Sequence, residues 1–406
     1  MIELQNHINR FFSELEIFGI KLGLEQTKLL FSKMGSPEKR LKFIHLAGTN
    51  GKGSVGAMLS AALSGVGFKT AFYSSPHLID IRERFRIDGK AISISELAEE
   101  ISLIEPHICE MRKNDMQPTY FEVTTAVAAA YFAKNSVDFV IWECGMGGRF
   151  DATNIVMPEL SIITGIALDH TAHLGSSIEK ITFEKAGIIK HNRPIFCGEL
   201  PEEAKKVITE TAASKNSECY FMEQDKPEQG DNFNYQQKNA KLAETVIQYL
   251  SEKFHFNSDK AVTNMANAKW PGRMQILKNG TIIDGAHNPQ AAEALVRSLT
   301  QLYPGRKYSI IFASLQDKES IKVVKILARI AEEFIFPEFR CSRGAVENHK
   351  LKVSAASIGI VNVKTVSSLK DALAFSGKNT LVTGSLYLAG ETLRELSCEK
   401  EVFNIY

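Results

Sequence analysis

The sequence lacks several features that would place it in a common class. Its six cysteines form no C-x-x-C pair and no cluster with histidine at zinc-finger spacing, which favours free thiols in a reducing compartment. No apolar stretch approaches the roughly 20 residues that span a bilayer, and the N-terminus has no signal-peptide core. Lys and Arg number 48 against 47 Asp and Glu, without the basic excess of a general nucleic-acid binder. We therefore expect a cytoplasmic protein with no membrane or nucleic-acid partner.

Apolar runs alternate with amphipathic segments almost throughout the 406 residues. Continuous apolar strands separated by helices are typical of a parallel sheet that is covered on both faces. The length favours two domains, and the stretch KWPGRMQ at 269–275 carries Pro and Gly together, after which the alternation restarts. We expect an α/β protein with an ATP-binding domain over residues 1–268 and a smaller α/β domain over 269–406.

A glycine-rich turn at residues 46–54, LAGTNGKGS, follows the apolar run FIHL and precedes a helix of small residues. Backbone N–H groups in such a turn can point at phosphate, and the helix N-terminus adds a positive dipole end. The strict G-x-x-x-x-G-K-[ST] pattern is not met, and a simple tight turn is the competing interpretation. The strand, lysine, hydroxyl and helix together favour a nucleotide-binding P-loop, with contacts from Gly48, Thr49, Asn50, Gly51, Lys52, Gly53 and Ser54.

Three polar residues follow predicted strands and are candidate metal ligands, because ATP chemistry uses Mg²⁺ to bridge phosphate oxygens. Glu143 ends DFVIWE, Ser75 ends AFYSS, and His170 follows LSIITGIALD. Open α/β sheets bind ligands at the carboxyl ends of their strands. A salt bridge to Arg149 is the alternative for Glu143, and a hydrogen-bonded structural role is the alternative for His170.

Two further segments carry residues suited to chemistry. Lys185 in FEKAGII lies on a predicted helix beside apolar residues, so a surface ion pair with Glu184 competes with a buried lysine that must be paired, neutralised or modified. In the second half, IIDGAHNP at 282–289 repeats the strand, glycine and helix design. Asp284 there is either a ligand residue or only the N-cap of the next helix.

Together these motifs resemble bacterial folylpolyglutamate synthase/dihydrofolate synthase, within the muramyl-ligase family of ATP-dependent amide ligases. The resemblance runs from about residue 10 to 391 and rests on the segments GTNGKGS, SSPHL, RERFRIDGK, ECGMGGRFDATN, DHTAHLG, EKAGIIK, WPGR, DGAHNP and VTGSLYLAGE. It implies a P-loop N-terminal domain with a mostly parallel sheet, a smaller Rossmann-like C-terminal domain that binds glutamate, and an active site between them.

The resemblance also implies roles for individual residues. Lys52, Lys185 and His170 would be catalytic, with Lys185 carbamylated. Ser75, Glu143 and His170 would serve two magnesium sites, and the nucleotide would also meet Asn239, Arg273, Asp284 and His287. The pterin region would include Pro76, His77, Phe121, Glu122, Asp151 and Ala152. One departure is Tyr235, which stands where the family often has histidine in H-Q-x-x-N-A.

The implied activity joins L-glutamate to a folate, and to dihydropteroate, through an acyl phosphate formed from ATP. Three alternatives stay open: another muramyl-type ligase, a P-loop kinase, and a non-catalytic nucleotide-binding regulator. The folate-branch segments SSPHL and GGRFDATN disfavour the first, and Ser54, displaced by one position, disfavours the second. Heptad repeats of a coiled coil are absent from the sequence, and we expect a monomer.

Overall fold

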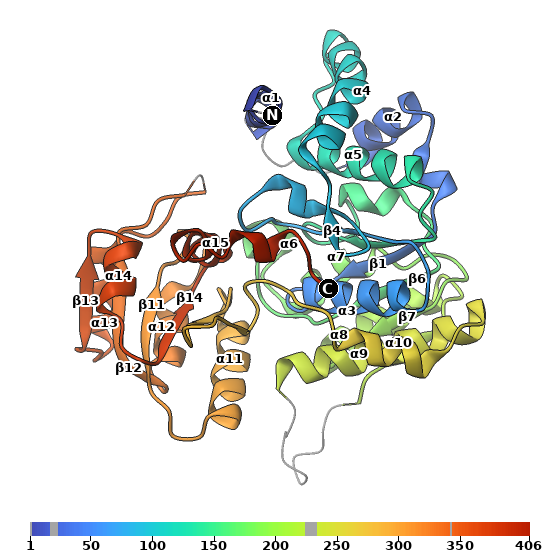
Figure 1. Cartoon of the computed structure of the whole chain (residues 1–406). Helices are drawn as coiled ribbons and strands as arrows, with labels where there is room; N and C mark the ends of the chain where they lie inside the picture. The colour runs from blue at the N-terminus through green and yellow to red at the C-terminus, as the bar shows by residue number, and fades with distance from the viewer. Residues whose placement is uncertain (1, 17–22, 224–233, 342) are drawn as a thin grey trace. The chain divides into compact units, whose positions relative to one another are not determined.

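A computed structural model describes residues 2–16, 23–223, 234–341 and 343–406 (Figure 1). The chain divides into two compact units. The first contains Met1–Gln224, Asn239–Lys269 and Phe403–Tyr406, and the second contains Asp225–Lys238 and Trp270–Val402. The main change of unit, between Lys269 and Trp270, lies one residue beyond the division expected at 268/269. The two short segments 225–238 and 403–406 belong to the opposite unit from the one expected.

The first unit is built on an eight-stranded sheet in the order β4-β3-β2-β5-β1-β6-β7-β8. The strands β2, β5, β1, β6, β7 and β8 pair in parallel with their neighbours. β3 and β4 add antiparallel pairings at the edge beyond β2. β1 and β5 are buried along their whole length, as continuous apolar strands are when helices cover both faces. The strands are β1 Phe43–Ala47, β2 Thr70–Tyr73, β3 Phe85–Ile87, β4 Lys90–Ala91, β5 Phe139–Glu143, β6 Leu160–Ile163, β7 Ile195–Cys197 and β8 Cys219–Phe221.

Successive residues of β2 point to opposite faces of this sheet, which shows how the helices cover it. Tyr73 packs in a core cluster with residues of α1, α2, α4 and α5. Phe72 lies against Gly56 of α3, where a Cβ atom would come 2.4 Å from the Phe72 ring. The helices are α1 Ile2–Glu16, α2 Glu25–Lys33, η1 Pro37–Arg40, α3 Lys52–Gly65, η2 Ile81–Arg84, α4 Ile94–Lys113, α5 Tyr120–Lys134, η3 Ala152–Ile155, α6 Thr171–Leu174, α7 Ile178–Ala186, α8 Glu202–Ala213, α9 Tyr235–Phe254 and α10 Ser258–Met265.

The second unit has a six-stranded sheet in the order β13-β12-β11-β14-β10-β9, parallel except for β9 at one edge. Phe312 and Phe336 of this sheet pack with apolar residues of α11, α12 and α13. The elements are β9 Gln275–Ile276, β10 Ile282–Ile283, α11 Pro289–Leu302, β11 Tyr308–Phe312, α12 Ser320–Leu327, β12 Ala331–Pro337, α13 Asn348–Ser357, β13 Val363–Val366, α14 Leu369–Phe375, β14 Thr380–Thr383, α15 Leu386–Glu395 and η5 Glu399–Val402.

These two sheets confirm the expected fold class, an α/β protein with mostly parallel sheets and a smaller C-terminal α/β part. Among the described residues, none of the helices combines the length and the hydropathy needed to cross a membrane.

Candidate active site

Four neighbouring parallel strands of the first unit, β2, β5, β1 and β6, end at the same edge of the sheet. Most of the residues predicted for phosphate and metal follow these ends. The glycine-rich turn follows β1, Ser75 follows β2, Glu143 is the last residue of β5, and His170 lies beyond β6. The carboxyl edge of a parallel sheet is where open α/β folds bind ligands, so the topology gathers the predicted set in one region.

The phosphate loop is fixed by contacts with the segment that follows β6. The Thr164 hydroxyl donates to the carbonyl of Asn50 over 2.6 Å, and the Thr49 amide donates to the carbonyl of Gly165 over 2.8 Å. Gly48 has a φ of +151°, and a Cβ atom there would come 2.1 Å from the Thr164 hydroxyl. Only glycine fits at that position, which leaves the backbone close to the strand end, as a phosphate cradle needs.

Two lysines donate to the same backbone oxygen of this loop. The Nζ atoms of Lys52 and Lys185 each lie 3.0 Å from the carbonyl oxygen of Gly48. Lys52 begins α3, and Lys185 reaches the loop from α7, which the sequence order alone does not reveal. The Lys52 ammonium at the start of a helix, beside the loop amides, suits a ligand that carries several negative charges, such as a nucleoside triphosphate.

The environment of Lys185 disfavours its charged form. The side chain is buried, and desolvation together with the nearby Lys52 lowers its pKa to about 7. The competing interpretation, a surface ion pair with Glu184, is not what the structure shows. Glu184 instead lies 3.9 Å from the Arg149 Nε atom, and the Arg149 guanidinium stacks on the Phe183 ring.

Glu143 is buried at the end of β5 and pairs with Lys52, with 4.0 Å between Nζ and Oε1. Its other carboxylate oxygen lies 3.4 Å from the amide of Ser75, so two of the predicted metal residues are neighbours. The alternative partner Arg149 is engaged with Glu184 and Phe183 instead. A buried carboxylate beside a hydroxyl residue is a suitable oxygen donor set for Mg²⁺.

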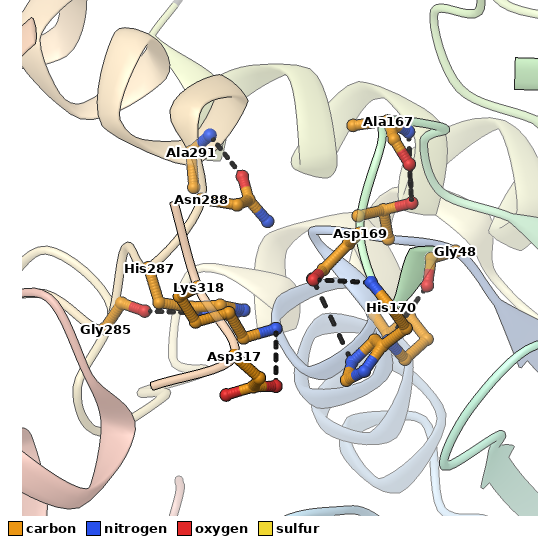
Figure 2. A network of polar contacts seen from close by, with 12 residues as sticks. Gly48, Ala167, Asp169, His170, Gly285, His287, Asn288, Ala291, Asp317 and Lys318 are labelled. Carbon is orange, nitrogen blue, oxygen red and sulfur yellow. Dashed lines mark hydrogen bonds and ion pairs between the residues drawn. The ribbon is translucent and has the colours of Figure 1, made fainter. Parts of the chain in front are cut away.

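His170 occupies the N-cap position of α6 with a left-handed φ of 50°. Its amide donates to Asp169 Oδ1 over 2.9 Å (Figure 2). Its ring Nε2 atom lies 4.0 Å from Asp169 Oδ2. Among residues 2–16, 23–223, 234–341 and 343–406, no group of three or more His, Cys, Asp or Glu side chains is arranged to hold a metal. The magnesium assignment of Ser75, Glu143 and His170 therefore stays a prediction.

The loop after β5 carries Asp151 and receives Phe121. A Cβ atom at Gly145 would come 2.6 Å from the Phe121 ring, so this ring from α5 packs directly on the loop. Asp151 is buried, and its carboxylate accepts from the amides of Met146 and Thr153 over 2.9 and 3.0 Å. Burial raises the pKa of this carboxyl group. Asp151 thus shapes the loop, and Ala152 follows it at the start of η3.

Glu122 lies on α5, next to Phe121, but its carboxylate has structural partners. It caps α5 with Thr119, accepting from the Thr119 amide over 2.8 Å, and it accepts from the Thr27 hydroxyl over 2.9 Å. This arrangement is a capping box with an added link to α2.

Pro76 and His77 follow Ser75 in the loop after β2. The Arg84 Nε atom donates to His77 Nδ1 over 3.0 Å, so Nδ1 is an accepting nitrogen of the His77 ring. The Arg84 guanidinium also lies over the Tyr120 ring, 5.3 Å from its centroid. The substrate roles of Pro76 and His77 stay predictions.

In the second unit the structure brings Arg273, Asp284 and His287 together. A Cβ atom at Gly285 would come 3.1 Å from an Arg273 guanidinium nitrogen, so the guanidinium lies beside the turn after β10. His287 donates from Nδ1 to the carbonyl of Gly285 over 2.8 Å (Figure 2). Asn288, and not Asp284, caps α11, accepting from the Ala291 amide over 2.8 Å (Figure 2). The N-cap interpretation of Asp284 is therefore wrong.

Asn239 belongs to the first unit and lies beside the phosphate loop. A Cβ atom at Gly51 would come 2.7 Å from the Asn239 side-chain oxygen.

Two other residues of the site were not predicted from the sequence. Thr164, directly after β6, holds the loop, and its place at a strand end was an available signal. Tyr235 stands out in the sequence only as a departure from the family, and the structure shows that its hydroxyl donates to Asp284 over 2.6 Å.

Comparison with known proteins supports the geometry. Residues 272–386 match the family model described as "Mur ligase, glutamate ligase domain". A dihydrofolate synthase/folylpolyglutamate synthase of Bacillus subtilis is 32% identical over 412 residues, covering 93% of this chain and 96% of the relative. The chain belongs to the folylpolyglutamate synthase/dihydrofolate synthase family.

Solved structures of this family superimpose along nearly the whole chain. An Escherichia coli FolC structure in complex with DHPP and ADP has a TM-score of 0.85 at 28% identity, covering 98% of each chain. A bifunctional folylpolyglutamate synthase/dihydrofolate synthase with Mn, AMPPNP and L-glutamate bound has a TM-score of 0.80 at 29% identity, covering 95% of this chain and 97% of that one. The resemblance expected from the motifs is confirmed.

Proposed function

We propose that this protein uses ATP to join L-glutamate to a folate carboxylate, and to dihydropteroate, with formation of an amide. The observation that carries the proposal is the convergence of Lys52 and Lys185 on the Gly48 carbonyl, beside the buried carboxylate of Glu143. Membership in the folylpolyglutamate synthase/dihydrofolate synthase family supports the choice of substrates. So do the ligands of two related structures, one bound to DHPP and ADP and the other to AMPPNP and L-glutamate.

Two steps account for the reaction. A substrate carboxylate oxygen attacks the γ-phosphorus of ATP, forming an acyl phosphate and releasing ADP. The glutamate amino nitrogen then attacks the acyl carbon, inorganic phosphate leaves, and a proton passes from nitrogen to solvent. In the first step the loop amides and Lys52 would stabilise the charge on the transferring phosphoryl group. Fixed donors suit this role because they need no reorganisation as the charge moves.

A divalent metal fits the donors present, and Glu143 with Ser75 and His170 would hold it. When bound, Mg²⁺ neutralises phosphate charge and orients the γ-phosphoryl group for in-line attack. Glu143 would then exchange its contact with Lys52 for the metal, which leaves the Lys52 ammonium free to follow the phosphate.

Lys185 would carry a carbamate. At a pKa of about 7, a large fraction of its amine is neutral at physiological pH. The neutral nitrogen attacks the carbon of CO₂, one C=O electron pair moves to oxygen, and the nitrogen loses a proton to water. The product is a carboxylate in place of an ammonium, which removes the repulsion between Lys185 and Lys52 and offers oxygen to a metal.

The second unit would bind the nucleotide through Arg273, Asp284 and His287 and would contain the glutamate site. Its match to a glutamate ligase domain supports this division of roles. Phe121 and the loop that contains Asp151 would receive the pterin ring, since an aromatic face and a buried carboxylate suit a flat heterocycle with N–H donors. We further propose a monomer located in the cytoplasm.

Phosphate release from MgATP in the presence of L-glutamate tests the proposal, with dihydropteroate and tetrahydrofolate compared side by side. Release that depends on glutamate with both substrates establishes both activities, and release with tetrahydrofolate alone restricts the enzyme to polyglutamylation. Release with neither, but with a UDP-muramoyl substrate and an amino acid, would replace the proposal by a muramyl-type ligase. A phosphorylated acceptor as the final product would indicate a kinase, and ATP binding without turnover would indicate a regulator.

A further inference from the structure

Tyr235, the first residue of α9, makes a short hydrogen bond in the second unit. Its phenol oxygen lies 2.6 Å from the Oδ2 atom of Asp284, and the phenol donates because a carboxylate only accepts. The Tyr235 amide also lies 3.3 Å from the hydroxyl of Ser298 on α11. Both ends of the tyrosine are therefore fixed to the segment that begins at β10 and continues through α11.

Asp284 is the point at which three chain segments meet. Only 3% of the residue is exposed, so its carboxylate needs donors from the protein. The Met274 amide donates to Oδ2 over 2.8 Å, and the Ala286 amide donates to Oδ1 over 2.9 Å. The phenol of Tyr235 adds a side-chain donor to these two backbone donors. The carboxylate thus ties the start of α9 to the residue after Arg273 and to the turn that carries His287.

The phenol is a donor throughout the physiological pH range. Burial and the Asp284 carboxylate raise the pKa of Tyr235 well above its ordinary value, against the opposing effect of Arg273. An imidazole, which the family often has here, would change its charge near neutral pH. The phenol keeps its single proton, and the rigid ring holds the O–H donor in a fixed position beside Asp284.

We propose that Tyr235 is a positioning residue for the nucleotide-binding turn of the second unit. It fixes the carboxylate of Asp284 and, through that carboxylate, the backbone that aims Arg273 and His287. This inference rests on the proposed function, in which Arg273, Asp284 and His287 meet the nucleotide. Tyr235 acts through Asp284 and does not itself touch reacting atoms.

Steady-state kinetics of Tyr235→Phe test the assignment. The change removes one oxygen atom, so the ring still fills its site, while Asp284 loses a donor. We expect the KM for ATP to rise about tenfold, the size expected for one hydrogen bond to a charged group. The KM for the folate substrate is expected to stay within twofold of wild type. A merely structural loss would lower the amount of active enzyme and kcat, without separating the two KM values.

Tyr308→Phe is the matched control. Tyr308 is a buried tyrosine of the same unit on β11, a strand separated from β10 by β14. Its phenyl variant should keep the wild-type KM for ATP. If Tyr235→Phe also keeps it, within twofold, the inference is overturned. Absence of any glutamate-dependent phosphate release by the wild-type protein would instead refute the proposed function, so the two failures are distinguishable.

A double-mutant cycle with Asp284→Asn gives an independent measurement. If Tyr235 acts through the carboxylate, the effects of the two substitutions on the KM for ATP will be non-additive, and Tyr235→Phe will add little in the Asp284→Asn background. Additive effects would show that Tyr235 influences nucleotide binding by another route and would overturn the inference.

Discussion

The Nζ atom of Lys185 lies 3.0 Å from the carbonyl oxygen of Gly48, although 137 positions separate the two residues in the sequence. The contact places a buried amine at the first residue of the phosphate loop. Burial and Lys52 together hold the pKa of that amine at about 7, so it is partly neutral where an ordinary lysine is charged. A neutral amine can react with CO₂. Without its positive charge it also attracts phosphate less strongly than an ordinary charged lysine does.

The first prediction concerns this amine. ¹³C-bicarbonate should give a carbamate signal in the NMR spectrum of the wild-type protein, and Lys185→Ala should abolish it and reduce turnover about 100-fold or more. The signal should grow between pH 6 and pH 8, because the reactive neutral amine increases as pH rises through about 7. Lys190→Ala is the control, since Lys190 also has a pKa lowered to about 8 but donates to Asn154. A signal that persists in Lys185→Ala would contradict the assignment.

The second prediction is that Glu143→Gln changes the metal requirement. A neutral amide binds Mg²⁺ more weakly than a carboxylate, so the Mg²⁺ concentration for half-maximal phosphate release should rise at least about tenfold. Glu159→Gln serves as the control. Glu159 forms ion pairs with Arg193 and Lys253 and does not lie at the carboxyl end of any strand that carries predicted site residues. An unchanged Mg²⁺ requirement in Glu143→Gln would remove this residue from the metal site.

Sequence patterns predicted the residues whose placement depends on strand order and strand ends. FIHLA and FVIWE are apolar throughout, which indicates strands buried on both faces, and parallel strands bring their carboxyl ends to one edge. The approach of the Ser75 amide to Glu143 follows from that rule. The N-cap of α11 is also readable from the sequence, because Asn288 directly precedes Pro289 at the first helical position, whereas Asp284 lies too far upstream to cap it.

Long-range contacts were beyond the reach of such patterns. Tyr235 and Asp284 are 49 positions apart, and nothing in either local segment indicates the other. The segment Phe403–Tyr406 returns to the first unit, where Asn404 pairs with Lys90 and the Tyr406 hydroxyl lies 3.0 Å from that of Ser60 on α3. Four residues are too few for a periodic signal, so only tertiary contacts determine where they lie.

The third prediction compares two glycines near the phosphate loop. Gly48→Ala should abolish measurable ATP binding, because its Cβ atom would come 2.1 Å from the Thr164 hydroxyl at a φ of +151°. Gly165→Ala should keep near-wild-type binding, since the nearest atom to its added Cβ is the Asn50 carbonyl oxygen at 3.8 Å. Isothermal titration with ADP measures both. Equal loss in the two variants would show that the loop responds to any added methyl group, and not to the close approach at Gly48.

The fourth prediction concerns acid stability and follows from His45 in β1. This histidine is fully buried, and its Nε2 atom lies 2.9 Å from the Thr153 hydroxyl and 3.1 Å from the Cys144 sulfur. Burial, and to a lesser extent the charge of Lys190, lowers the pKa of His45 to about 3.

Below pH 6.5 the unfolded chain binds a proton that the folded chain does not, so the free energy of unfolding falls as pH drops from about 6.5 toward about 3. At pH 5 the cost is about 2 kcal/mol, because pH 5 lies roughly 1.5 pH units below the pKa of 6.5 in the unfolded chain and each unit corresponds to about 1.36 kcal/mol. Urea unfolding at pH 7 and pH 5 should therefore show a loss that is about 2 kcal/mol smaller in His45→Gln than in wild type. His191→Gln, which alters an exposed histidine, should retain the wild-type loss, and an equal loss in His45→Gln would contradict the assignment.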